Sequence, residues 1–295
     1  MSQSIKEIED IFKNTPMGEI ENRAREFETD ERGGVKKVIE KYQKKLEAGK
    51  TECERLDSLF YFEKKFRAET PVICGIDEVG RGPFAGPVVA GAVILPADVV
   101  EAWKEGMMHS PLGEWTRNNG VTTSDSMDSQ DKTKTARDWM DITGLNDSKQ
   151  VNVKRREVLY EEITSKAVAY GIGVIPPARI DEVNIRNATM EAMKLAVEDL
   201  GVVPDLLLID AMQLKNVPIR QVDIIKGDAR SLSIAAASIV AKVTRDRMMV
   251  DYAELYPEYH FDKNAGYGTA EHIAALKEHG PCAIHRRSFI GNYVN

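Results

Sequence analysis

The sequence has little cysteine and histidine, and it contains no long apolar run. Its three cysteines, Cys53, Cys74 and Cys282, are far apart and form no CxxC pair, which excludes a disulfide framework and a structural zinc site. The five histidines form no metal-binding pair at i, i+4. No stretch approaches the roughly 18 apolar residues of a membrane helix, and the polar start MSQSIKEIEDIFK has no signal core. We therefore expect a cytoplasmic protein with no membrane partner.

The sequence also lacks an excess of positive charge. Its 40 Lys and Arg residues against 47 Asp and Glu residues leave a formal net charge of −7. Domains that hold nucleic acid by bulk electrostatics are usually basic, often with a pI above about 9. With 42% hydrophobic and 29% charged residues, the chain is of ordinary globular composition. The charge therefore argues weakly against a nucleic-acid-binding protein.

Residues 1–70 are predicted to form a helical extension. Apolar residues recur there at steps of three and four, as on one face of an amphipathic helix: Val35, Val38, Ile39, Tyr42, Leu46, Cys53, Leu56, Leu59 and Phe60. Off this stripe lie Lys36, Lys37, Lys41, Lys44 and Lys45. These lysines indicate a solvated helix surface more than a face that binds a polyanion.

Residues 97–146 interrupt an otherwise regular pattern. The preceding residues 72–96 read as strand, turn and strand, whereas 116–136 is almost wholly polar and is predicted to be a surface insertion, flexible in its middle. All tryptophans of the chain fall in 97–146: Trp103, Trp115 and Trp139. They either anchor this segment on the body or form a patch for a protein partner.

After residue 145, predicted helices and strands alternate, which indicates an α/β sheet covered by helices. Helices are expected at 150–170, 187–200, with Asn187 or Thr189 as N-cap, and 270–279. Strands are expected at YGIGVIP, PDLLLIDAM and QVDIIKGD. A long helix follows over SLSIAAASIVAKVTRDRMMVDYAELY. Its small residues 235–238 should allow close packing on the sheet, and Cys74 should be a buried apolar residue of the first strand.

Acidic residues follow several apolar strands at the point where each strand ends: Asp77, Glu78, Asp210 and Asp228. A carboxylate at the end of an apolar strand is costly to desolvate without a compensating partner. Several such ends meeting in one sheet would form a hard-oxygen site suited to Mg²⁺ or Mn²⁺. Adjacent strand residues point to opposite faces, so Asp77 and Glu78 can share an ion only if the strand ends or bulges there. The following GRG is expected to supply that irregularity.

A series of motifs in this order resembles the bacterial ribonuclease HII family. The motifs are CGIDEVGRGPFAGPVVAGAVILP, LNDSK, LLLIDAM, KGDARSLSIAAASIVAKVTRDRMM, NAGYGT and GPCAIHRRSF. The resemblance covers roughly residues 71–290 outside the insertion, which looks like a departure from the family pattern. It implies a ribonuclease H-like fold, with a central mixed sheet flanked by helices and a helical C-terminal part. It also implies cleavage of the RNA strand of RNA/DNA hybrids and nicking 5′ of single ribonucleotides in duplex DNA, a step of ribonucleotide excision repair.

The same resemblance assigns roles to individual residues. It implies that Asp77, Glu78, Asp210 and Asp228 are catalytic and hold two divalent ions, Mg²⁺ or Mn²⁺. It implies two-metal hydrolysis that leaves a 3′-hydroxyl and a 5′-phosphate. It further implies that Gly80, Arg81, Gly82 and Tyr267 recognise the ribonucleotide. Glycines allow close approach of the main chain to a sugar, and the 2′-OH distinguishes RNA from DNA.

Cations are expected where the substrate binds. Between residues 226 and 250, five basic residues stand against two acidic ones: Lys226, Arg230, Lys242, Arg245 and Arg247 against Asp228 and Asp246. Candidate phosphate contacts are Lys149, Ser233 and Lys242. For Lys242, pairing with Asp246 at i, i+4 is an equal alternative. Asp246 is interpreted as a helix-surface partner. His285, Arg286 and Arg287 are expected to contact the DNA backbone.

These patterns predict an N-terminal extension over 1–70 and a catalytic domain over 71–295 interrupted at about 97–146. A monomer is expected, acting on RNA/DNA hybrids and ribonucleotide-containing duplex DNA. Two other functions remain open. The carboxylates would also suit a Mg²⁺-dependent phosphatase or phosphotransferase acting on a small molecule, and a non-catalytic nucleic-acid-binding module could keep the same fold.

Overall fold

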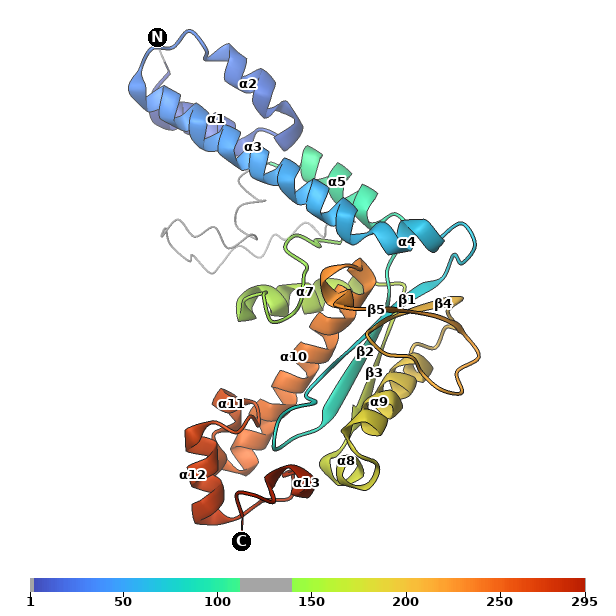
Figure 1. Cartoon of the computed structure of the whole chain (residues 1–295). Coiled ribbons are helices and arrows are strands. Elements are labelled where there is room, and N and C mark those ends of the chain that lie inside the picture. The colour runs from blue at the N-terminus through green and yellow to red at the C-terminus, as the bar shows by residue number, and fades with distance from the viewer. Residues whose placement is uncertain (1–2, 112–139, 295) are drawn as a thin grey trace. The chain divides into compact units, whose positions relative to one another are not determined.

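The computed structural model describes residues 3–111 and 140–294, which fall into two compact units (Figure 1). The first unit comprises Met1–Ser58 and Asp98–Gly144, and the second comprises Leu59–Ala97 and Leu145–Asn295. Within the described ranges, no helix is long and apolar enough to cross a membrane.

The first unit is helical in its described residues. It contains α1 (Ile5–Asn14), a 3-10 turn η1 (Met17–Glu19), α2 (Ile20–Glu26), nearly all of α3 (Gly33–Leu59) and α5 (Val99–His109). A capping box starts α1, in which the Ser4 hydroxyl accepts from Glu7 N at 3.2 Å and Glu7 Oε2 accepts from Ser4 N at 2.7 Å. The ring of Phe12 in α1 lies 5.4 Å from that of Tyr42 in α3.

The apolar stripe predicted for α3 is confirmed. Its buried members within the first unit are Val35, Val38, Tyr42, Leu46 and Leu56. The lysines beside it are exposed, except the half-buried Lys45. Two of them form surface ion pairs, Lys41 with Glu9 and Lys44 with Glu40. These lysines therefore lie on a solvated helix surface, as the sequence indicated.

The segment 97–146 is not wholly a polar surface insertion. Helix α5 buries Val99, Val100, Trp103 and Met107, and the indole N–H of Trp103 donates to Thr143 Oγ1 at 3.1 Å. Trp103 thus anchors one end of the segment inside the first unit. Trp115, Trp139 and the expected flexible middle lie outside the described residues.

The second unit is built on a mixed five-stranded sheet of order β3-β2-β1-β4-β5. The strands are β1 (Ile73–Val79), β2 (Val88–Ile94), β3 (Ala169–Ile175), β4 (Leu206–Asp210) and β5 (Arg220–Ile224). β1 pairs antiparallel with β2, and β2 with β3, whereas β1–β4 and β4–β5 are parallel. The predicted mixed sheet is confirmed.

Helices and 3-10 turns connect and cover these strands. They are α4 (Tyr61–Phe66), α7 (Val153–Lys166), α8 (Pro177–Val183), α9 (Ile185–Asp199), η2 (Gly227–Ala229), α10 (Leu232–Leu255), η3 (Pro257–Tyr259), α11 (Phe261–Asn264), α12 (Ala270–His279) and α13 (Arg287–Ile290). The expected N-cap of α9 was wrong. Asn184 caps it instead, with φ of 68° and a side chain that accepts from Asn187 N.

Helices α9 and α10 pack on opposite faces of the sheet (Figure 1). A Cβ built on Gly75 or Gly91 would meet the α10 backbone at 2.1 or 2.5 Å, so α10 lies directly on β1 and β2. Its small residues 235–238 are all buried, which confirms their packing role. The same test on Gly173 gives 1.9 Å to Ala192 O of α9.

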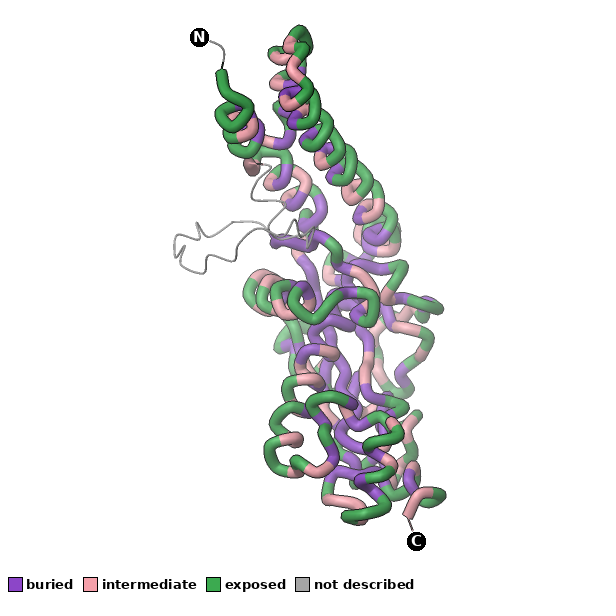
Figure 2. Tube along the Cα trace, turned by 90° about the vertical axis from the view of Figure 1, so that its left-hand side faces the viewer, coloured by how far each residue is buried: buried purple, intermediate pink, exposed green. Residues whose placement is uncertain are grey.

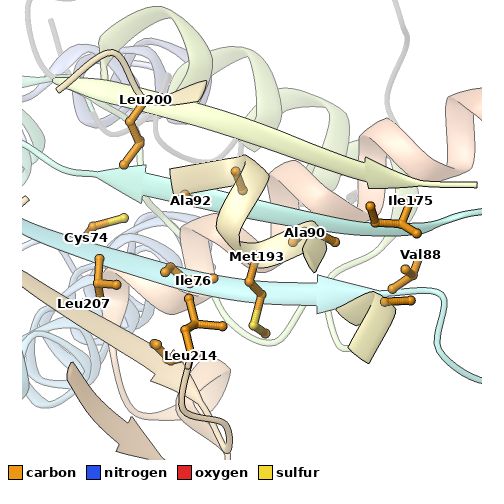
Figure 3. Close-up of a cluster of buried hydrophobic side chains, with 14 of the residues drawn as sticks. Cys74, Ile76, Val88, Ala90, Ala92, Ile175, Met193, Leu200, Leu207 and Leu214 are labelled. Atoms are coloured by element: carbon orange, nitrogen blue, oxygen red, sulfur yellow. The ribbon is translucent and has the colours of Figure 1, made fainter. Parts of the chain in front are cut away.

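The core between α9 and the sheet is apolar throughout (Figure 3). It includes Cys74, Ile76, Ala90, Met193 and Leu207. Cys74 is fully buried as predicted, and burial raises the pKa of its thiol to about 12. Strand β2 is buried throughout and β1 in all but its last two residues, and buried positions gather in the interior of the second unit (Figure 2). Both faces of β1 are covered, so the site is confined to its C-terminal end.

Candidate active site

Asp77 and Asp210 lie side by side at the ends of two parallel strands. The pairing of β1 with β4 ends at Ile76 and Ile209, and each aspartate is the next residue. Side chains alternate along a strand, so residues two apart share a face. Asp77 therefore lies on the α10 face with Gly75, whose backbone contacts α10. Asp210 lies on the same face with Leu208, which packs on Ile234 of α10. The sheet therefore brings both carboxylates to one face.

The strand irregularity expected at Asp77 and Glu78 does not occur there. The β1–β2 pairing stays regular through Val79, so Glu78 is directed away from the α10 face, and the backbone departs from the strand only at Gly80, where φ is 87°. Its Oε1 accepts from Arg81 Nη1 at 3.1 Å. Its Oε2 is buried and has no hydrogen-bond partner among the described residues. This oxygen is expensive to leave unsatisfied.

Asp228 reaches the site from the turn before α10. The amide of Gly227 donates to Asp210 Oδ1 at 2.7 Å, which ties η2 to the end of β4. After burial, the charges of Asp147 in the LNDSK motif and of Asp210 raise the pKa of Asp228. Asp147 was missed as an acidic neighbour, although the motif that contains it had been singled out.

Burial and mutual repulsion raise the pKa of several of these carboxyls. For Asp77, burial is the largest cause, followed by the charges of Glu78, Asp210 and Asp228. Burial also raises the pKa of Glu78, against the opposing effect of Arg81. For Asp228, burial is followed by the charges of Asp147 and Asp210. The group is therefore under repulsion that a cation would relieve.

The donor set fits a divalent cation of the Mg²⁺ type. It consists of carboxylate oxygens, which Mg²⁺ and Mn²⁺ prefer, and the orphaned Oε2 of Glu78 is an acceptor that a cation would satisfy. In the described part of the chain, no three acidic, histidine or cysteine side chains already stand as a ligand set for one ion. Ion binding would therefore need side chains of this group to turn.

The GRG loop and Tyr267 lie next to each other beside these carboxylates. A Cβ built on Gly82 would lie 3.8 Å from Tyr267 Cε1. The turn that carries Tyr267 is joined to the loop because Phe84 N donates to Gly266 O at 2.8 Å. Tyr267 is 46% exposed, so a ligand can reach this residue. Residues far apart in the sequence thus form one surface.

Two buried arginines, Arg245 and Arg286, hold this loop from behind. Both are fully buried, and neither lies within ion-pair distance of a carboxylate in the described residues. They donate to backbone carbonyls of residues 80, 81, 85, 86, 87 and 265. The sequence did not reveal this role, because an arginine near a basic end usually indicates an exposed contact.

The expected DNA contacts of His285 and Arg286 were therefore wrong. His285 is 3% exposed, and its Nε2 lies 3.0 Å from Nε2 of His272. Burial lowers the pKa of His285 to about 4, so the imidazole is neutral at physiological pH. Arg287 is exposed, and its expected contact with DNA stays a prediction.

The three candidate phosphate contacts differ in their surroundings. Lys149 is exposed in the loop before α7, where its charge lowers the pKa of Asp228. Lys242 pairs with Asp246 at 2.5 Å, which bears out the surface-partner role of Asp246. Ser233 is 1% exposed, and its hydroxyl donates to the buried Glu63 at 2.6 Å. A phosphate cannot reach that hydroxyl, so the prediction for Ser233 was wrong.

The predicted basic face is also smaller than the sequence indicated. Arg245 is buried, and Arg247 pairs with Glu157 and Glu161 on the surface. Arg230 lies over the ring of Phe62 at 5.3 Å and donates to Ile225 O. Lys226, in a left-handed backbone conformation, is exposed next to Asp228.

Comparison with known proteins identifies the family. The family model described as Ribonuclease HII matches residues 132–292, and the model described as Ribonuclease HII N-terminal domain matches residues 4–67. The Ribonuclease HII of Lachnoclostridium phytofermentans is 48% identical over 269 residues, which cover 91% of this chain and 89% of the relative. The chain belongs to the ribonuclease HII family. It is therefore an endonuclease, a hydrolase that degrades the RNA of RNA/DNA hybrids, and enzymes of this kind use divalent metal ions.

A second relative also matches nearly the whole chain. The Ribonuclease HII of Bacillus cereus strain G9842 is 42% identical over 287 residues, covering 97% of this chain and 95% of the relative. The departure of segment 97–146 from the family pattern stays a prediction.

Solved structures support the ribonuclease H-like fold. The ribonuclease H2 of Pyrococcus horikoshii has a TM-score of 0.52 and 22% identity, covering 73% of this chain and 92% of that chain. The RNase HII of Archaeoglobus fulgidus, solved in complex with PCNA, has a TM-score of 0.51 and 22% identity, covering 73% of this chain and 93% of that chain. The predicted fold class is confirmed.

Proposed function

We propose that the enzyme nicks duplex DNA on the 5′ side of a single embedded ribonucleotide, in addition to cleaving RNA/DNA hybrids, and leaves a 3′-hydroxyl and a 5′-phosphate. The observation that carries this proposal is the adjacency of two groups. Carboxylates gather at the ends of β1 and β4, and the GRG loop with Tyr267 lies beside them. One group suits phosphodiester hydrolysis, and the other suits recognition of a sugar.

The metal ligands in this proposal are Asp77, Glu78, Asp210 and Asp228. When bound, two divalent ions, Mg²⁺ or Mn²⁺, supply activation of the attacking water and stabilisation of the leaving 3′ oxygen. Asp77 and Asp210 are held by the sheet, whereas Asp228 is held through the bond from Gly227 N to Asp210. This scaffold limits the movement needed to assemble the ligand set.

Recognition of the ribonucleotide is assigned to Gly80, Arg81, Gly82 and Tyr267. At Gly82, where the nearest neighbour of an added Cβ is Tyr267 at 3.8 Å, the backbone can approach the ribose closely, whereas the absent Cβ of Gly80 leaves room for Arg245 and Pro87 behind the loop. The exposed Tyr267 ring can stack on the sugar or base, and its hydroxyl can form a hydrogen bond. Lys149 and Lys242 are the remaining candidates for phosphate contacts, and Lys242 would have to exchange its partner Asp246 for a phosphate.

A nicking assay tests the substrate. Duplex DNA with one ribonucleotide is incubated with the enzyme in Mg²⁺ or Mn²⁺ and resolved on a denaturing gel. Cleavage at the 5′ side of the ribonucleotide supports the proposal. Cleavage of an RNA/DNA hybrid without cleavage at the single ribonucleotide would contradict the proposal.

Substitution of Asp77 tests the metal site. Loss of residues that only orient metal ligands costs about 10- to 100-fold in metal affinity or activity, so Asp77→Asn should reduce cleavage by more than roughly 100-fold. Asp251→Asn, on the exposed surface of α10, is the matched control and should cleave like wild type. Unchanged cleavage by Asp77→Asn would contradict the assignment.

A further inference from the structure

The GRG loop is clamped on its inner side by the guanidinium of Arg286. Nη2 donates to Gly80 O at 2.5 Å and to Gly86 O at 2.8 Å, Nη1 donates to Arg81 O at 2.9 Å, and Nε donates to Gly86 O at 3.0 Å. The planar fork of an arginine can satisfy several acceptors at once in this way. One side chain therefore fixes the direction of consecutive peptide carbonyls in the loop.

These carbonyls determine where the neighbouring amides point. In a trans peptide the C=O of one residue and the N–H of the next point in opposite directions, and the described residues contain no cis peptide bond. Because Gly80 O and Arg81 O turn inward to Arg286, the amides of Arg81 and Gly82 turn away from it. Within the described residues, neither amide donates to another part of the protein.

The position of Arg286 is set by the chain around it. Residues 284–286 run along the loop, since Gly86 N donates to Ile284 O at 2.9 Å and Arg286 N donates to Phe84 O at 2.8 Å. The guanidinium also lies 5.2 Å from the ring centre of Phe289. A buried guanidinium surrounded by carbonyls is held in one geometry.

We propose that Arg286 is a positioning residue for ribonucleotide discrimination. By holding the carbonyls of Gly80 and Arg81, it presents the amides of Arg81 and Gly82 as outward donors for the oxygen atoms of the ribonucleotide. Successive outward amides of this kind form a concave site that suits an electron-rich or anionic group. This inference rests on the proposed function and adds the residue that orients the loop.

Arg245 supports the second half of the loop. Nε donates to Pro87 O at 2.9 Å, Nη2 to Ala85 O at 3.1 Å and Nη1 to Ala265 O at 3.0 Å. It therefore joins the loop to the turn that carries Tyr267. Burial and then the charge of Arg245 lower the pKa of Arg286 to about 9. Because this pKa is still above neutral pH, the guanidinium stays protonated.

The test measures discrimination separately from folding. Nicking of a duplex with one ribonucleotide gives kcat and KM, and inhibition by the same duplex made wholly of DNA gives Ki. The ratio of Ki to KM reports recognition of the ribonucleotide. A smaller folded fraction lowers the apparent kcat and leaves this ratio unchanged, so a merely structural role of Arg286 would not alter it.

Arg286→Lys keeps the positive charge but loses the fork. Loss of the fork should therefore lower the ratio of Ki to KM roughly ten-fold, which corresponds to about 1.4 kcal/mol. Arg179→Lys is the control, because Arg179 is an exposed arginine of the same unit that pairs with Glu182 and Glu191, and its ratio should match wild type. A ratio within about twofold of wild type in Arg286→Lys would overturn the inference.

Gly82→Pro tests the same inference if Arg286→Lys does not fold. It removes the amide N–H directly, at a position where an added Cβ has Tyr267 as its nearest neighbour at 3.8 Å. The ratio of Ki to KM should fall as in Arg286→Lys, and an unchanged ratio would overturn the inference. A wild-type enzyme that does not nick at the ribonucleotide would instead contradict the proposed function.

Discussion

Glu63 is a buried carboxyl that the enzyme uses as a structural acceptor. Its Oε1 accepts from Ser231 Oγ at 2.7 Å, Ser233 N at 2.9 Å and Ser233 Oγ at 2.6 Å. Its Oε2 is buried without a hydrogen-bond partner among the residues described. Burial raises the pKa of Glu63 above its usual value, against the lowering effect of the two serines. Helix α4 thereby binds the N-terminus of α10.

Glu63→Gln should change how stability depends on pH. A raised folded-state pKa means that the protonated carboxyl stabilises the fold fully below pH about 4.3, the unfolded value. This contribution is lost as the pH rises through the folded-state pKa, at about 1.4 kcal/mol per pH unit. The neutral Gln variant has no such loss. Urea unfolding at several pH values between 4.5 and 8 should therefore show that the free energy of unfolding of the variant increases relative to that of wild type as the pH rises.

Glu254→Gln provides the matched control for this measurement, because Glu254 is an exposed carboxyl on α10. Its stability curve should run parallel to that of wild type across the same range. Parallel curves for Glu63→Gln as well would show that Glu63 titrates near its usual pKa in the folded enzyme.

At the scale of elements, the site depends on how closely α10 approaches β1. Gly75 lies two residues before Asp77 on the same face, and a Cβ there would come within 2.1 Å of the backbone carbon of Ser233. The first turn of α10 follows directly on η2, which carries Asp228. The distance between α10 and β1 therefore affects both the stability of the fold and the positions of Asp77 and Asp228.

Gly75→Ala should destabilise the enzyme by about 1 to 3 kcal/mol, because a methyl group forced into a close-packed contact must displace backbone. Urea unfolding measures this change. Gly291→Ala is the control, since nothing lies within 4 Å of a Cβ at that position, and its midpoint should stay near that of wild type. A wild-type midpoint for Gly75→Ala would contradict the close approach of α10.

At the scale of the whole molecule, the charge is distributed unevenly. The formal net charge of −7 includes the carboxylates that lie together near the C-terminal ends of β1 and β4 in the second unit. Their mutual repulsion opposes folding when no cation is bound. The division of the chain at residues 70 and 71 into an extension and a catalytic domain stays a prediction, which limited proteolysis would test.

Mg²⁺ should raise the thermal stability of the wild-type enzyme. An ion that binds only the folded state at about 100 times its Kd stabilises it by about 2.7 kcal/mol. Differential scanning fluorimetry with and without Mg²⁺ measures the shift in Tm, with NaCl of equal ionic strength as control. Asp77→Asn should show a smaller shift and a higher Tm in EDTA than wild type. Equal Mg²⁺ shifts in both proteins would contradict a site that includes Asp77.

The sequence by itself determined much of the fold and the candidate acidic residues. Periodicity in α3, apolar runs ending in Asp77 and Asp210, and the small residues of α10 are local patterns, and each reports an element or a strand end without knowledge of its neighbours. The family motifs then indicated the chemistry. Local patterns are readable because they reflect burial of one face of one element.

The tertiary structure alone decided the surroundings of the polar side chains. Ser233, His285 and Arg286 were expected at the surface, but packing of the C-terminal segment and of α4 buries them. Whether an arginine is solvated by water or by the carbonyls of a loop 200 residues away depends on contacts between distant segments. The charge of Arg286 is satisfied only by carbonyls that the fold brings together, and no pattern along the sequence records that arrangement.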